Sequence, residues 1–216
     1  MGDSSNYIEN QQVIHNYEDK KIPRFLSNNI PISSKHIIGR KKELQEIWLH
    51  LSDNNPAVLV NGIGGIGKTA LASKYLVGYN KNYHHLAWLT VSTSIRDAFV
   101  NNAVLLNNLQ ISTEVNQLLQ NQQPNQALAF VINTLSNRKQ TLVVIDNAND
   151  KKDIALYRQL FTRSKCHFLL TSRVKPEGWK TVSVDSLQID LAISLFKTHY
   201  GKTAIEGIPD QKIEDL

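Results

Sequence analysis

The chain has 216 residues, of which 41% are hydrophobic and 20% charged, as is usual for globular proteins. This composition excludes collagen-like, disulfide-rich and fully disordered chains, and the length is sufficient to bury a core. The net charge of +5 could suit a nucleic-acid partner, but the lysines and arginines are scattered in short pairs. We therefore favour a solvated basic surface over a nucleic-acid interface.

The sequence carries no pattern that directs a chain to a membrane or to an oxidising compartment. No apolar run approaches the roughly 20 residues of a membrane span, and the first residues form no apolar signal-peptide core. Cys166 is the single cysteine, so it cannot form an internal disulfide. These features predict a cytoplasmic protein without a membrane partner.

Local patterns divide the chain into an arm and a domain of alternating elements. Residues 1–35 are rich in asparagine, glutamine, serine and charge without a sustained period, which predicts an arm or linker. Apolar spacing from residue 36 onward predicts helices over 40–51, 70–79, 96–109, 126–135 and 191–200, and strands over 57–60, 85–91, 141–145, 167–171 and 181–184. The asparagine- and glutamine-rich span 116–126 predicts an exposed loop.

Strands that alternate with helices predict an α/β fold with a parallel sheet covered on both faces. Right-handed crossovers place the carboxyl ends of all parallel strands at one edge, where ligands of open α/β sheets bind. Polar residues that follow the predicted strands are therefore the candidates for a functional site.

Eight residues between the first predicted strand and the next helix match the phosphate-loop pattern G-x-x-x-x-G-K-[ST]. Glycines in such a loop let successive backbone N–H groups form a nest for phosphate oxygens. Lys68 is placed to bind the β- and γ-phosphates, and the Thr69 hydroxyl to bind Mg²⁺. A glycine-rich turn that binds nothing is the alternative, which the strand-loop-helix context disfavours. The predicted nucleotide-binding residues are Gly62, Gly64, Gly65, Ile66, Gly67, Lys68, Thr69 and Ala70.

Asp146 ends the apolar run Leu-Val-Val-Ile-Asp, where a carboxylate can hold Mg²⁺ directly or through water. A structural aspartate that opens a turn is the alternative. Rapid hydrolysis needs a general base beside this aspartate, but the next residue is Asn147, whose amide cannot accept a proton. The pattern therefore predicts a site that holds nucleotide and hydrolyses it slowly.

Arg173 follows the fourth predicted strand, where a guanidinium could reach a γ-phosphate. A surface arginine leaving a strand is the alternative. We predict catalytic roles for Lys68, Asp146 and Arg173, with Thr69 and Asp146 as Mg²⁺ ligands. The histidines show no metal-ligand spacing, so no other metal is expected.

The motifs, taken in order, resemble those of the NB-ARC subgroup of STAND P-loop NTPases, which includes plant disease-resistance proteins and bacterial NLR-like proteins. They are Ile38-Gly39-Arg40 before a helix with Glu43-Leu44, the phosphate loop, Leu86-Ala87-Trp88-Leu89, Leu-Val-Val-Ile-Asp and Leu-Leu-Thr-Ser-Arg. The resemblance covers roughly residues 36–200.

The resemblance implies a three-layer α/β/α sandwich with a five-stranded parallel sheet in the order 2-3-4-1-5. It implies that ATP or ADP binds with Mg²⁺, and that Arg173 reaches the phosphates. The backbone around Ile38 and the side chain of Arg40 would contact the adenine and ribose side. Such proteins act as switches in signalling and defence, which exchange ADP for ATP and then form homo-oligomers.

Family members continue into a helical domain with a proline that covers the adenine, and then into a winged helix with a histidine that senses the β-phosphate. Neither motif is present here. We expect residues 36–185 to form the nucleotide-binding domain and 186–216 the start of a truncated helical domain. The full chain is then expected to include the helical domain, the winged helix and a helical-repeat sensor.

The favoured function is a nucleotide-dependent switch that is at most a weak ATPase. Two alternatives remain open: an actively hydrolysing ATPase of the AAA+ motor kind, and a DNA-binding regulator of the STAND type.

Overall fold

The computed structural model describes residues 22–31, 39–53, 55–187 and 189–200. Its centre is a parallel sheet of β1 (Ala57–Asn61), β2 (His85–Thr90), β3 (Thr141–Asp146), β4 (His167–Ser172) and β5 (Lys180–Ser183). The strand order is β2-β3-β4-β1-β5. The predicted fold class and the predicted strand order are both confirmed.

In β1, β2, β3 and β4, successive side chains enter two different cores, because side chains alternate between the faces of a sheet. In β1, Val58 and Val60 pack in one core, whereas Ala57 and Leu59 pack in the other. Strands buried on both faces need continuous apolar runs, and β1, β3 and β4 each contain an unbroken run of three or four apolar residues.

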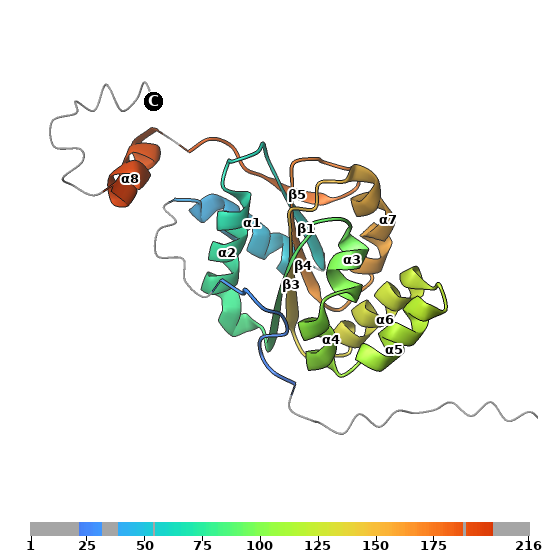
Figure 1. Cartoon of the computed structure of the whole chain (residues 1–216). Helices are drawn as coiled ribbons and strands as arrows, with labels where there is room; N and C mark the ends of the chain where they lie inside the picture. Colours follow the sequence, from blue (N-terminus) through green and yellow to red (C-terminus); the bar gives the residue numbers. More distant parts are fainter. Residues whose placement is uncertain (1–21, 32–38, 54, 188, 201–216) are drawn as a thin grey trace, which may run out of the picture.

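Helices cover both faces of this sheet (Figure 1). On one face lie α1 (Lys41–Ser52) and α2 (Lys68–Tyr79), and on the other lie α3 (Ile95–Val100), α4 (Ala103–Leu109), α5 (Ser112–Gln120), α6 (Pro124–Ser136) and α7 (Lys151–Thr162). A short 3₁₀ turn, η1 (Asn80–Asn82), follows α2, and α8 (Ile189–Tyr200) lies apart from the sheet. The arrangement is the three-layer sandwich expected.

Three helical expectations need correction. The helix predicted over 96–109 is two helices, because the Asn102 side chain accepts the Leu105 N–H at 3.0 Å and begins α4. The loop predicted over 116–126 is correct only at 121–123, because α5 extends to Gln120 and α6 begins at Pro124. Helix α7 was not predicted, although Asp150 caps its first turn.

Residues 22–31 of the predicted arm pack against the edge of the sheet. The Leu26 N–H donates to the Leu86 carbonyl at 2.8 Å, and the Leu86 N–H donates to the Arg24 carbonyl at 2.8 Å. The Leu26 side chain is fully buried. The domain boundary at residue 35 remains a prediction, but this part of the arm belongs to the packed structure.

Among the described residues, no helix combines the length and apolarity that crossing a bilayer requires.

Candidate functional site

The phosphate loop joins β1 to α2 at the carboxyl edge of the sheet. Gly67 has φ 98° and precedes the first residue of α2, a backbone conformation that glycine adopts without steric cost. A Cβ on Gly62 would lie 2.7 Å from the Val184 carbonyl oxygen, so this position requires a glycine as well. Nothing lies within 4 Å of a Cβ built on Gly65 or Gly67, so this side of the loop is open to a ligand.

Lys68 is the first residue of α2, and its side chain returns over the loop. Its Nζ donates to the carbonyl oxygens of Gly62 at 2.8 Å and Ile63 at 2.7 Å. Burial lowers the pKa of the Lys68 ammonium, the nearby Arg173 guanidinium lowers it further, and Asp146 partly opposes both. The ammonium thus lies beside the nest, at the place where a polyphosphate would bring negative charge.

Asp146, at the end of β3, is bonded to two threonine hydroxyls. Thr69 Oγ1 donates to Asp146 Oδ1 at 2.9 Å, and Thr171 Oγ1 donates to the same oxygen at 2.6 Å. A carboxylate and a hydroxyl beside a phosphate nest form the hard-oxygen set that Mg²⁺ prefers. The residues present therefore fit a magnesium ion held together with phosphate oxygens.

Asn147 and Arg173 directly follow β3 and β4, the two strands that carry Asp146 and Thr171. The Arg173 guanidinium carbon is 3.6 Å from the position of a Cβ on Gly64, which places the guanidinium beside the phosphate loop. Asn147 has φ 66°, and its side-chain amide donates to the Val91 carbonyl oxygen at 3.0 Å. The Asn147 side chain is therefore engaged with the end of β2.

Arg40 contacts the phosphate loop from the side of α1. Its guanidinium forms an ion pair with Glu43 at 2.8 Å and donates to the Ile66 carbonyl oxygen at 3.3 Å. The predicted contact of Arg40 with adenine and ribose remains a prediction. Ile38, the other residue of that prediction, lies outside the described residues.

A cavity of about 600 Å³ covers the open side of the loop. Among its lining residues are Gly65, Gly67, Lys68, Thr69, Ala70 and Arg173, all predicted from the sequence. Residues not predicted for the site also line it: Asn29, Pro31, Ser73, Trp88, Asn149 and Thr171. Thr171 could have been found from strand order, since β4 lies beside β3, whereas no sequence signal points to Asn29 or Pro31.

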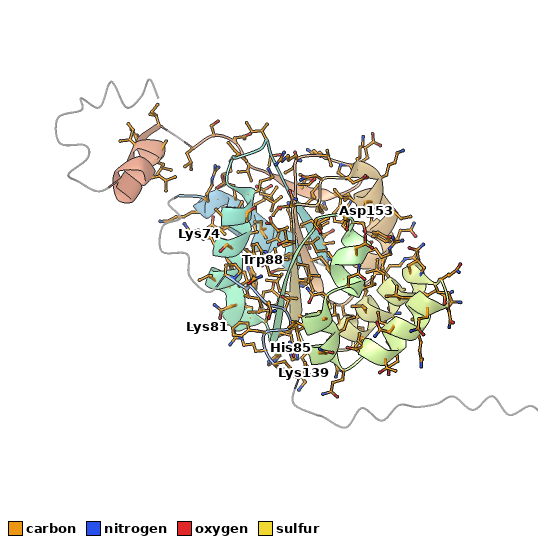
Figure 2. The ribbon with its side chains drawn as sticks, viewed as in Figure 1. Lys74, Lys81, His85, Trp88, Lys139 and Asp153 are labelled. Carbon is orange, nitrogen blue, oxygen red and sulfur yellow. The ribbon has the colours of Figure 1, made fainter. Side chains whose placement is uncertain are left out.

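Figure 2 shows Trp88 and Asp153 towards this edge of the sheet, with Lys81, His85 and Lys139 towards the opposite edge. A second cavity of about 450 Å³ opens at that opposite edge, with Tyr83 and His167 among its lining residues. It has no phosphate loop, so the first cavity is the candidate nucleotide site.

Comparison with known proteins agrees with this geometry. The NB-ARC domain family matches residues 40–205. The disease resistance protein RPP8 of Arabidopsis thaliana is 27% identical over 167 residues, which are 74% of this chain and 18% of that protein. The chain therefore spans only a small part of that relative.

Among solved structures, the Walker-type ATPase PABY2304 of Pyrococcus abyssi has the same fold, with a TM-score of 0.51 and 15% identity. The similarity covers 88% of this chain and 65% of that one. Because the NB-ARC match spans more than half of the sequence and coincides with the phosphate loop and the sheet, the chain belongs to the NB-ARC family of nucleotide-binding P-loop NTPases.

Proposed function

We propose that this chain is the adenine-nucleotide switch of an NLR-like signalling or defence protein, and that it exchanges ADP for ATP. The observation that carries the proposal is the cluster of Thr69, Asp146 and Thr171 beside an open phosphate nest. A metal-binding carboxylate next to a phosphate loop is the arrangement that P-loop NTPases use for a nucleotide with Mg²⁺.

In this proposal each residue of the site has a distinct role. Backbone N–H groups of residues 62–67 cradle the phosphates, and Lys68 leaves the loop carbonyls to bind phosphate oxygens. Thr69 and Asp146 hold Mg²⁺, which when bound neutralises phosphate charge. Arg173 contacts the terminal phosphate and so distinguishes ATP from ADP.

Slow hydrolysis is part of the proposal, because the carboxylate and amide groups after Asp146 are engaged elsewhere. The Asn147 amide donates to the Val91 carbonyl, and it has no basic atom that could take a proton from water. The Asp150 carboxylate accepts the N–H groups of Lys152 and Asp153 at 2.8 and 3.0 Å, and so begins α7. Neither group is placed as a general base for hydrolysis.

The remaining features of the proposal concern the whole protein. We place it in the cytoplasm, with residues 36–185 as the nucleotide-binding domain and 186–216 as the start of a helical domain. Its proposed partners are a helical domain, a winged helix and a helical-repeat sensor of the same full-length chain. Exchange of ADP for ATP would favour an open state that forms homo-oligomers, provided that ATP binds that state more tightly.

Calorimetric titration with ADP and with a non-hydrolysable ATP analogue, each with and without Mg²⁺, tests the proposal. We expect a dissociation constant for ADP of about 1 µM or below, which corresponds to roughly 8 kcal/mol of binding free energy. Absence of ADP binding at about 100-fold higher concentration would contradict the proposal.

A turnover assay separates the switch from a motor. The engaged side chains of Asn147 and Asp150 lead us to expect a kcat well below about 1 s⁻¹, the lower end of common enzyme rates. Several turnovers per second would favour an actively hydrolysing ATPase instead.

A further inference from the structure

Two asparagine side chains after Asp146 connect the ends of three strands. The Asn147 amide donates to the Val91 carbonyl oxygen at 3.0 Å, just past the end of β2. The Asn149 amide donates to Asn147 Oδ1, and Asn149 Oδ1 accepts the backbone N–H of Arg173 at 2.8 Å, just past β4. We call Val91, Asn147, Asn149 and Arg173 together the asparagine relay.

The relay uses both functions of each amide. Asn147 and Asn149 each donate one hydrogen bond and accept one, which aspartate cannot do when ionised and alanine cannot do at all. Asn147 also has φ 66°, a left-handed conformation that asparagine adopts more readily than most residues. Asparagine therefore meets the conformational and the hydrogen-bonding requirement at this position together.

Asn147 is also hydrogen-bonded to a side chain of β4. The Asn147 N–H donates to Thr171 Oγ1 at 2.9 Å, and the same hydroxyl donates to Asp146 at 2.6 Å. The turn that carries the relay is thus fixed to the carboxylate proposed to hold Mg²⁺. A shift of this turn would move the backbone of Arg173 relative to Asp146.

Arg173 needs such support because its guanidinium lies near another cation. The guanidinium carbon is 3.6 Å from a Cβ position on Gly64, and its charge helps to lower the pKa of Lys68. Within the ranges that the structure describes, the guanidinium donates no hydrogen bond and forms no ion pair. Its position therefore depends on where the backbone of Arg173 is held.

We propose that Asn147 and Asn149 are positioning residues, which hold Arg173 where its guanidinium contacts the terminal phosphate of a nucleoside triphosphate. The relay would then set the preference of the site for triphosphate over diphosphate. This inference rests on the proposed function, and it assigns Asn147 a role that goes beyond the absence of a general base.

Two variants break the relay at different points. Asn147→Gly removes the amide but leaves a residue that tolerates the left-handed backbone, and Asn149→Ala removes the hydrogen bond to Arg173. With Mg²⁺ present, each variant is titrated with ADP and with a non-hydrolysable ATP analogue. We expect the analogue to bind about 10-fold more weakly and ADP to bind within about 2-fold of wild type. Asn116→Ala, at an exposed position of α5, is the matched control and should leave both affinities unchanged.

A double-mutant cycle with Arg173→Ala tests whether the relay acts through the guanidinium. We expect Arg173→Ala to weaken the analogue to the same degree, and Asn149→Ala to cause no further loss in that background. Full additivity of the two losses would overturn the inference, as would equal weakening of ADP and analogue by the relay variants. Wild-type protein that binds neither nucleotide would instead contradict the proposed function itself.

Discussion

His167, at the start of β4, is partly buried and bonded through its ring to Tyr83. The Tyr83 hydroxyl lies 2.9 Å from His167 Nδ1 and 3.2 Å from the Tyr75 hydroxyl. Burial lowers the pKa of His167 and raises the pKa of Tyr83 to about 12. Both rings are therefore held in their neutral forms at physiological pH.

We expect the free energy of unfolding to fall as acid protonates His167. The unfolded histidine binds a proton at about pH 6.5, whereas the folded histidine binds it at lower pH. The contribution of His167 is therefore fully present above that pH and is lost as the pH falls through the lowered pKa. In urea unfolding at pH 7.5 and 5, His167→Gln should lose less stability between the two pH values than wild type.

His84→Gln, at an exposed position, is the control and should keep the wild-type difference between the two pH values. If His167→Gln lost as much stability between pH 7.5 and pH 5 as wild type, protonation of His167 would not be the cause of the loss.

Residues of the site could be predicted where a short motif carries the chemistry. The phosphate loop was identifiable from spacing alone, and Asp146 from its place after an apolar strand. Asn149 could not, because its role depends on the backbone of Arg173, which follows another strand and meets Asn149 only in the folded sheet. Long-range contacts of this kind leave no local pattern in the sequence.

At the scale of elements, the sequence analysis missed the helices α5 and α7 for different reasons. Helix α5 fully buries only Val115, so its apolar stripe is weak and its asparagines and glutamines resemble a loop. Helix α7 buries Ile154, Tyr157 and Phe161 at helical spacing, and the Asp150 cap precedes them. The signal for α7 was therefore present in the sequence, whereas α5 is held by its contacts with α4 and α6.

The cap of α7 gives a direct test at this scale. Asp150→Ala should lower the free energy of unfolding by about 1 kcal/mol, because two N–H groups of the first turn lose their acceptor. Asp150→Asn keeps an oxygen acceptor and should cost only a few tenths of that. Urea unfolding measures both, and an equal cost for the two substitutions would argue against the cap.

For the whole molecule, the sheet order followed from the family resemblance, but the packing of residues 22–31 did not. Nothing in the aperiodic sequence of this segment distinguishes the buried Leu26 from apolar neighbours such as Phe25 and Ile30. Its burial depends on pairing with the edge strand β2, where Ser27 also bonds to the backbone of Trp88. This segment continues to Asn29 and Pro31 in the lining of the nucleotide cavity. The arm thus connects the edge of the sheet to the site.

We expect Leu26→Ala to destabilise the domain by about 2–5 kcal/mol, since it removes a fully buried side chain from the core. The adjacent Phe25 is 47% exposed, so Phe25→Ala should cost about 0.5 kcal/mol or less. Thermal or urea unfolding of the two variants compares them directly. Equal stabilities would mean that the arm does not contribute to the core.

The central claim is that the loop around Lys68 binds a nucleotide, and ADP affinity of Lys68→Ala measured by calorimetry tests it most directly. Loss of a charged donor to phosphate should cost about 1.5–3 kcal/mol, or roughly 10- to 100-fold in affinity. Lys139→Ala, at an exposed position towards the opposite edge of the sheet (Figure 2), is the matched control and should bind ADP as wild type does. An ADP affinity in Lys68→Ala equal to that of wild type would contradict the account.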